Sequence, residues 1–163
     1  MTGSTLPDSQ QTLCVVLVAP QIPPNTGNVA RLCAVTGCRL HLVEPLGFSI
    51  DDRELKRAGL DYWDQVFVKL HPSFDAYLAQ FPQARRVLFS ARSARSLYEV
   101  RFRPGDHLIF GSETEGLPRE LLGGATGQVA SIPMLAQRRS LNLSTAVGIA
   151  TYEAIRQLGA GGP

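Results

Sequence analysis

Pro23-Pro24-Asn25-Thr26-Gly27-Asn28-Val29-Ala30-Arg31 is the stretch of this sequence that decides the fold. It follows an apolar run over residues 13–18, which is typical of a buried strand, and it leads into a helical pattern. Its polar side chains are therefore expected at the carboxyl edge of a sheet, where open α/β sheets bind their ligands. Capping of the helix by Asn25 or Thr26, with Arg31 as an ordinary surface residue, explains the stretch about equally well.

Outward from this stretch, short apolar runs alternate with helical segments, which predicts an α/β fold with a mostly parallel sheet flanked by helices. The expected strands cover residues 13–18, 39–44, 65–69, 86–90, 107–110 and 128–132. The expected helices cover residues 28–36, 53–59, 73–80, 118–122 and 143–158. Gly37 is placed to end the first of these helices in the left-handed conformation that suits glycine.

Length and composition predict one domain over residues 12–160, preceded by a disordered polar tail at residues 1–11. The formal charge of +2 is too small to indicate nucleic-acid binding by itself. Three cysteines without paired spacing favour buried small hydrophobes in a reducing, cytoplasmic setting over a disulfide framework or a metal site. We expect no membrane span, because no apolar run approaches the roughly 20 residues that one needs, and no signal peptide.

The last helix is apolar over more than one face. One face is formed at helical spacing by Leu143, Ala146, Val147, Ala150, Ala154 and Leu158, and Ile149, Tyr152 and Ile155 widen it. Such a helix is either buried within one chain or packed against a second subunit as well. The residues alone favour neither arrangement.

Two further motifs carry polar groups. In residues 107–118 a buried strand ends at Gly111, and a loop with Glu113, Glu115 and Gly116 follows. Backbone groups at the two glycines could hydrogen-bond an adenine or a ribose, although the loop matches neither the dinucleotide fingerprint nor a phosphate-binding loop.

The third motif covers residues 132–146, where Ser140, Asn142 and Ser144 crowd the start of the last helix. Helix capping explains one of these residues well. A small-molecule site at the free N–H groups of the helix start explains the whole set better.

A local basic stretch lies between Arg85 and Arg103, where six arginines stand against a single acid, Glu99. Such a stretch can bind phosphates even when the total charge is small. A solvated loop with arginine in place of lysine is the alternative. We expect RNA contacts from Arg92 and Arg95, and from Arg138 in the third motif.

Taken together, in this order and spacing, the three motifs resemble the SpoU-type branch of the SPOUT RNA 2′-O-methyltransferases. The match runs from Leu13 to Gly159 and is specific for the small YibK/TrmL group of tRNA wobble-nucleotide 2′-O-methyltransferases. The residues that carry it are Ile22-Pro23-Pro24-Asn25-Thr26-Gly27-Asn28, Arg31-Leu32-Cys33, Gly37, Leu40-His41, Glu44-Pro45 and Arg57-Ala58-Gly59-Leu60-Asp61-Tyr62.

The resemblance implies a C-terminal deep trefoil knot, a rare exception to normal chain connection. It also implies a homodimer that packs around the last helix, and S-adenosylmethionine held in the loops of the knot. The cofactor contacts implied in this sequence are Phe89, Gly111, Ile132, Met134, Ser140 and Leu141. No metal is implied.

The resemblance further implies catalytic roles for Asn25, Arg31, Glu113, Ser140 and Asn142. We expect Arg31 at the ribose, Glu113 and Asn25 as supports that orient it, and Asn142 near the methyl donor. In this family the counterpart of Arg31 is often described as the general base, but a free guanidinium stays protonated far above neutral pH. We therefore expect Arg31 mainly to hold the ribose and its phosphate and to stabilise the developing alkoxide.

Other functions stay open on the sequence. An enzyme of the same type could modify another tRNA position or ribosomal RNA, and a non-catalytic RNA-binding module could share the fold. A Rossmann-type nucleotide enzyme is disfavoured because the glycine fingerprint is missing.

Overall fold

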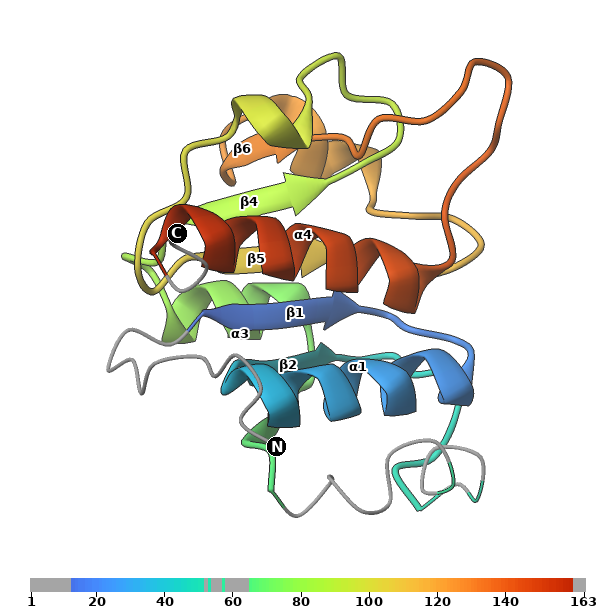
Figure 1. The fold of residues 1–163 in the computed structure, drawn as a ribbon. Helices are drawn as coiled ribbons and strands as arrows, with labels where there is room; N and C mark the ends of the chain where they lie inside the picture. The colour runs from blue at the N-terminus through green and yellow to red at the C-terminus, as the bar shows by residue number, and fades with distance from the viewer. Residues whose placement is uncertain (1–12, 52, 54–56, 58–64, 160–163) are drawn as a thin grey trace, which may run out of the picture.

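The computed structural model describes residues 13–51, 53, 57 and 65–159 and shows three layers (Figure 1). Its strands are β1 (Cys14–Val18), β2 (Arg39–Val43), β3 (Val68–His71), β4 (Arg86–Phe89), β5 (His107–Phe110) and β6 (Gln128–Ala130). Its helices are α1 (Pro23–Thr36), α3 (Phe74–Gln80) and α4 (Leu143–Gln157), with short 3-10 helices η1 (Leu97–Glu99) and η2 (Arg119–Gly123). The expected tail and most of the helix expected over residues 53–59 lie outside the described residues.

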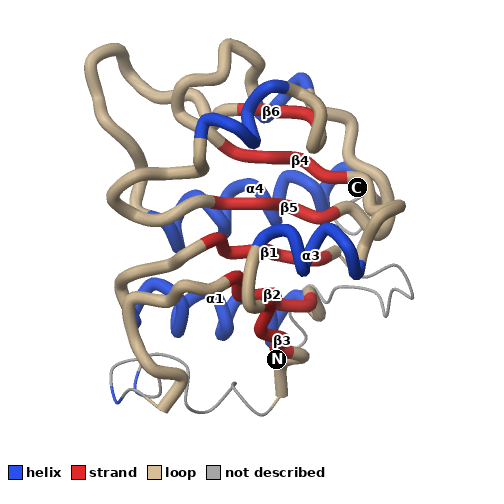
Figure 2. Tube along the Cα trace, turned by 180° about the vertical axis from the view of Figure 1, so that it is seen from behind, coloured by secondary structure: helices blue, strands red, loops and turns tan. Residues whose placement is uncertain are grey.

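All registered strand pairs of the six-stranded sheet are parallel, in the order β3-β2-β1-β5-β4-β6. The α/β prediction with a mostly parallel sheet is therefore confirmed. Helices α1 and α4 cover one face of the sheet, and α3 covers the other (Figure 2). Because the strands are parallel, the loops that follow β1, β4, β5 and β6 all leave from the same edge.

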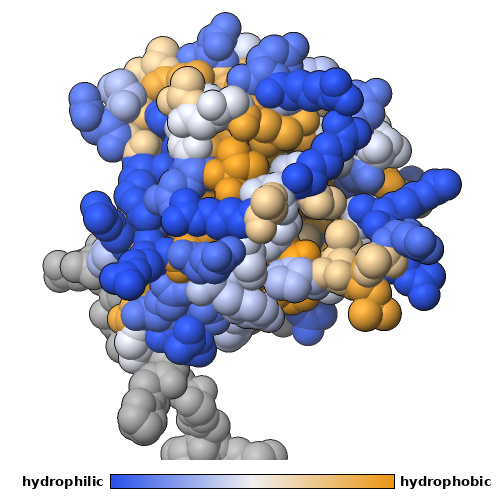
Figure 3. Space-filling view, turned by 90° about the horizontal axis from the view of Figure 1, so that it is seen from above, coloured by the Kyte–Doolittle hydropathy of each residue, from blue (hydrophilic) through white to orange (hydrophobic). Residues whose placement is uncertain are grey.

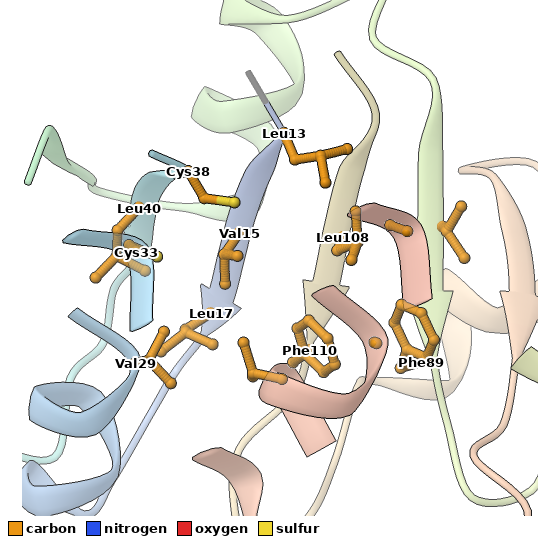
Figure 4. Close-up of a cluster of buried hydrophobic side chains, with 14 of the residues drawn as sticks. Leu13, Val15, Leu17, Val29, Cys33, Cys38, Leu40, Phe89, Leu108 and Phe110 are labelled. Atoms are coloured by element: carbon orange, nitrogen blue, oxygen red, sulfur yellow. The ribbon is translucent and has the colours of Figure 1, made fainter. Parts of the chain in front are cut away.

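The strands appear as apolar runs in the sequence because helices bury the sheet on both faces. Val15 and Leu17 of β1 pack toward α1 and α4, in a cluster that includes Phe89 and Phe110 (Figure 4). Val16 and Val18 point to the opposite face and pack in a second cluster with Tyr77 of α3. All three cysteines are free and buried, as predicted for small hydrophobes.

Helix α1 begins five residues earlier than the sequence pattern predicts. Asn-Thr-Gly-Asn is a poor helix-forming run by propensity, but Pro23 and Pro24 occupy the first two helical positions, where a missing N–H costs nothing. The helix ends as predicted, with Gly37 at a φ of 76° and its N–H bonded to the carbonyl of Cys33. The Pro23–Arg31 stretch is thus the first half of a helix and not the loop before one.

Other boundaries also differ from prediction: strands β1, β2, β4 and β6 are each one or two residues shorter than expected, and three further cases follow. Strand β3 starts at Val68 and not at residue 65, because β2 offers it partners only from Leu40 to Val43. The helix expected from Pro118 is the 3-10 helix η2, and Pro118 caps it from outside. Helix α3 starts one residue late because Ser73 is its N-cap, accepting the N–H of Ala76.

Between the sheet and α3 lies a buried cluster of rings. His41 Nδ1 lies 3.0 Å from His71 Nε2, and the hydroxyl of Tyr77 lies 2.6 Å from His107 Nδ1. Burial lowers the pKa of His41 to about 3 and of His107 to about 4, with smaller effects from positive neighbours that include Arg86. These histidines are therefore neutral in the folded protein at neutral pH.

Acidification from pH 7.5 to 5.5 is expected to destabilise the fold. The unfolded chain protonates these histidines near pH 6.5, and the folded chain does not, so the free energy of unfolding drops as the pH falls through that value. The expected loss is about 1 kcal/mol for each of the two histidines over this interval, measured by urea unfolding at the two pH values. The Y77F/H107L variant lacks the pair of Tyr77 and His107, so its free energy of unfolding should fall about half as much over this interval as that of the wild type. An equal fall in both proteins would assign the effect to other groups.

Candidate functional site

A cavity of about 620 Å³ opens at the carboxyl edge of the sheet. Its walls come from the segments that follow β4, β5 and β6, which the parallel sheet brings together although they are far apart in the sequence. The lining residues are Phe89, Ser90, Ala91, Arg92, Phe110, Gly111, Ser112, Glu113, Thr114, Glu115, Gly116, Leu117, Leu122, Ile132, Met134, Arg139, Ser140, Leu141, Leu143 and Ala146. Seen from above, at the β6 edge of the sheet, the molecule shows apolar surface set between hydrophilic side chains (Figure 3).

The six residues expected to contact a cofactor all line this cavity: Phe89, Gly111, Ile132, Met134, Ser140 and Leu141. Two aromatic rings contribute to its wall, since Phe89 and Phe110 stack with centroids 4.8 Å apart. Their register on neighbouring strands β4 and β5 fixes this contact. The cavity thus offers both an apolar wall and polar loops.

Gly111 allows two backbone segments to approach closely. A Cβ at this position would lie 2.0 Å from the carbonyl carbon of Gly116 and 2.2 Å from the nitrogen of Leu117. Gly116 itself has a φ of 69° and donates its N–H to the carbonyl of Ser112. Of the backbone groups at Gly116 that were expected to be available to a ligand, the N–H is used by the turn from Ser112.

Glu113 binds the start of α1 from the β5 loop. Its carboxylate accepts the N–H of Gln21 at 2.8 Å, the N–H of Ile22 at 2.7 Å and the side-chain amide of Asn25 at 3.2 Å. A carboxylate at a helix N-terminus is stabilised both by these donors and by the helix dipole. Neither Asn25 nor Thr26 is the N-cap: that position is Ile22, which makes no side-chain cap hydrogen bond, and Glu113 instead fixes the chain just ahead of α1.

Asn142 extends this connection to α4. Its Nδ2 donates to Oδ1 of Asn25 at 3.0 Å, and its Oδ1 accepts the N–H groups of Ser144 and Thr145. Asn142 is thus the N-cap of α4 and at the same time a partner of α1. The chain of contacts from Glu113 through Asn25 to Asn142 joins three of the five predicted catalytic residues.

The other two predicted catalytic residues, Ser140 and Arg31, are not part of this chain of contacts and lie in different places. Ser140 lies on the cavity wall. Arg31 is exposed on α1, six residues beyond Asn25, which is about 9 Å along the helix axis and about 120° around it. It is not among the residues that line the cavity of its own chain.

Of the six arginines between Arg85 and Arg103, two stabilise the fold and are not available to RNA. Arg85 forms an ion pair with the buried Asp106, and Arg86 donates to the carbonyl of Phe81. The expected basic stretch is therefore smaller than its sequence suggests. Its loop is further ordered by Arg95, whose guanidinium donates to Gln128 at 3.0 Å.

Arg92 lines the cavity, as does Arg139, which was not among the residues expected to contact RNA although its neighbour Arg138 was. Arg138 is exposed and lies outside the lining set. No periodicity could choose between these two residues, because they lie in a loop whose direction is set locally by Gln137 at a φ of 66°. Only the pair of adjacent arginines was visible in the sequence.

Over the described ranges, no group of three or more His, Cys, Asp or Glu residues could hold a metal ion. In the same part of the chain, no helix is both long and apolar enough to span a bilayer.

Comparison with known proteins agrees with this geometry. The model of the SpoU rRNA Methylase family matches residues 12–152. A tRNA (cytidine(34)-2'-O)-methyltransferase of Saccharophagus degradans is 50% identical over 149 residues, which cover 91% of this chain and 97% of that protein. The enzyme of the same name from Escherichia coli K12 is 48% identical over 149 residues, covering 90% and 94%.

A solved structure described as "Structural insights into the 2-OH methylation of C/U34 on tRNA" superposes with a TM-score of 0.88. It is 53% identical in sequence and covers 93% of this chain and 99% of its own.

Replacing Glu113 by Gln should loosen the start of α1. The variant loses the charge and one acceptor oxygen, and hydrogen bonds to charged groups contribute about 1.5–3 kcal/mol each. We expect the free energy of unfolding to fall by about 2 kcal/mol and amide exchange at Gln21 and Ile22 to accelerate, measured by urea unfolding and by NMR. The matched control is E115Q, an exposed carboxylate of the same loop; equal effects in both variants would contradict a specific role of Glu113.

Proposed function

The chain belongs to the SpoU methylase family, and from that premise we propose that it is an RNA 2′-O-methyltransferase that modifies the wobble nucleotide of tRNA. The reaction transfers a methyl group from S-adenosylmethionine to the ribose 2′-hydroxyl of cytidine or a modified uridine at position 34. The support for this substrate is the near-complete coverage of relatives about 50% identical that are named for it. Because tRNA is the substrate, we place the reaction in the cytoplasm.

The carrying observation for the cofactor is the cavity at the carboxyl edge, whose wall includes all six residues expected to contact it. The stacked pair Phe89 and Phe110 offers an apolar surface to an adenine, and the close approach at Gly111 shapes a loop that can follow a bent ligand. S-Adenosylmethionine supplies an activated methyl group on a sulfonium, whose departing thioether is neutral. The residues present fit such a group.

The catalytic work left to the protein is alignment and proton removal. Glu113, Asn25 and Asn142 use their polar atoms on one another and on the helix starts, so we assign them the task of holding α1 and α4 at fixed positions beside the cavity. Ser140 on the cavity wall offers a hydroxyl beside the reacting groups. We assign Arg31 to the ribose, where it stabilises the alkoxide that forms as the hydroxyl proton leaves.

We also propose the deep trefoil knot and the homodimer. Residues 131–142 lead from the edge strand β6 back to α4, which packs against α1 and against β5 in the middle of the sheet, and this return path suits a threaded chain. Ile149 and Tyr152 of α4 are 37% and 49% exposed, and Val35 of α1 is 56% exposed. These apolar side chains would be covered by a second copy of the chain.

A labelled-methyl transfer assay tests the function. The protein is incubated with labelled S-adenosylmethionine and either bulk tRNA or ribosomal RNA, and the modified nucleotide is mapped. We expect label in tRNA alone, at the 2′-oxygen of position 34. Label in ribosomal RNA or at another tRNA position would contradict the proposed substrate and identify the actual one. Transfer to neither RNA would favour a non-catalytic RNA-binding module.

In the same assay, R31A should reduce transfer at least a hundredfold while the affinity for S-adenosylmethionine, measured by calorimetry, stays within twofold. Loss of cofactor binding together with stability would instead assign Arg31 a structural role. Mixing R31A chains with chains inactive at the cavity shows where Arg31 acts. If methyl transfer is recovered, Arg31 acts at the cavity of the other subunit. If it is not recovered, the RNA spans from the cavity to α1 of the same chain.

A Cβ at Gly111 should damage the cofactor site. G111A must push the backbone at Gly116 and Leu117 away, so we expect at least a tenfold weaker affinity for S-adenosylmethionine by calorimetry. Gly123 is the matched control, because a Cβ there meets nothing within 4 Å. Unchanged affinity in G111A would show that this loop does not shape the cofactor site.

A further inference from the structure

Two arginines on the cavity wall have side chains without an acceptor among the residues that the structure describes. Arg92 follows β4, and Arg139 lies in the segment that leads from β6 to α4; both are exposed. Within the described part of the chain, neither guanidinium takes part in a hydrogen bond or an ion pair, whereas those of Arg85, Arg86 and Arg95 all donate to protein oxygens. Both charges are therefore available to a ligand at the mouth of the cavity.

The carboxylates on the same wall do not cancel these two charges. Glu113 is compensated by three donors from the start of α1. Glu115 is exposed on the β5 loop, and its single negative charge leaves an excess of positive charge when it is set against the two guanidinium groups. The segments that carry the two arginines thus present positive charge to whatever enters the cavity.

The chemistry of the two substrates decides what this pair binds. S-Adenosylmethionine carries a single carboxylate, which one bidentate guanidinium would satisfy. A nucleotide within an RNA chain carries a phosphate on each side of its ribose, and that ribose must reach the cavity for its 2′-hydroxyl to react. Two guanidinium groups from two separate segments match two phosphates better than they match one carboxylate.

We propose that Arg92 and Arg139 bind the two phosphates that flank the methylated ribose, and so hold that ribose at the mouth of the cavity. The inference rests on the proposed function and adds to it a residue, Arg139, and a recognition mode. The contacts fix the position of the RNA backbone and carry no base information. Choice of nucleotide therefore depends on other contacts.

The first test is the salt dependence of tRNA binding. Each phosphate contact on a single-stranded segment contributes about 0.7 to the slope of log affinity against log salt. We expect the slope to flatten by about 0.7 in R92A and in R139A and by about 1.4 in the double variant, while the calorimetric affinity for S-adenosylmethionine stays within twofold.

Arg101→Ala is the matched control, because Arg101 is an exposed arginine of the same basic stretch that does not line the cavity. An equal loss of slope in R101A would overturn the clamp in favour of a diffuse basic surface. Weakened cofactor binding in the double variant, with an unchanged salt slope, would overturn it in favour of the cofactor carboxylate.

The second test uses an anticodon stem-loop RNA with a neutral methylphosphonate in place of one phosphate flanking position 34. If an arginine contacts that phosphate, combining its alanine variant with the methylphosphonate RNA should weaken binding no more than either change alone. Additive losses for both arginines at both phosphates would overturn the proposal. Failure of the proposed function is a separate result, because then the wild-type protein itself transfers no methyl group to tRNA.

Discussion

The carboxylate of Glu113 is the contact on which the arrangement of the site depends. It lies on the loop after β5 and accepts two backbone N–H groups ahead of α1 and the amide of Asn25, 88 residues away in the sequence. Without it, the two N–H groups just ahead of a helix that begins with two prolines and a run of weak helix formers would lose these acceptors. The same contact fixes the cavity loop relative to the helix that carries Arg31.

This connection also explains why the predicted polar residues form a network and are not spread over separate sites. The side chain of Asn25 donates a hydrogen bond to Glu113 and accepts one from Asn142, so it joins the β5 loop to the starts of α1 and α4. Asn142 in turn caps α4. Two helix starts and one cavity wall are therefore held by three side chains, and a displacement of any one of them alters the others.

How much could be predicted depended on whether a feature was local. Strand β5 was predicted to the residue, and the end of α1 at Gly37 followed from glycine's access to positive φ. The start of α1 was not predictable, because its cap comes from a distant loop. The start of β3 was missed because its pairing partner, and not its own apolar residues, determines where the strand begins.

The candidate site followed the same division. The residues expected to contact a cofactor came from the motif resemblance, and the fold brings all of them to one cavity. The arginines were harder, because Arg85 and Arg86 look identical in sequence to Arg92 but are used by Asp106 and Phe81. The sequence gives only the number of charged side chains. Binding of RNA needs arginines whose side chains are not already paired with protein oxygens, and only the fold shows which these are.

The unpaired arginines make the mouth of the cavity positively charged. A site that must accept both a sulfonium cofactor and a polyanionic RNA cannot rely on net charge, which is only +2 for this chain. It can instead satisfy one carboxylate internally and leave two guanidinium groups unsatisfied at its mouth. Glu113 then stabilises the fold without repelling phosphates, and Arg92 and Arg139 keep their charge for the RNA. The same local ordering that removes Arg95 from this set, its hydrogen bond to Gln128, also holds in place the loop that presents Arg92.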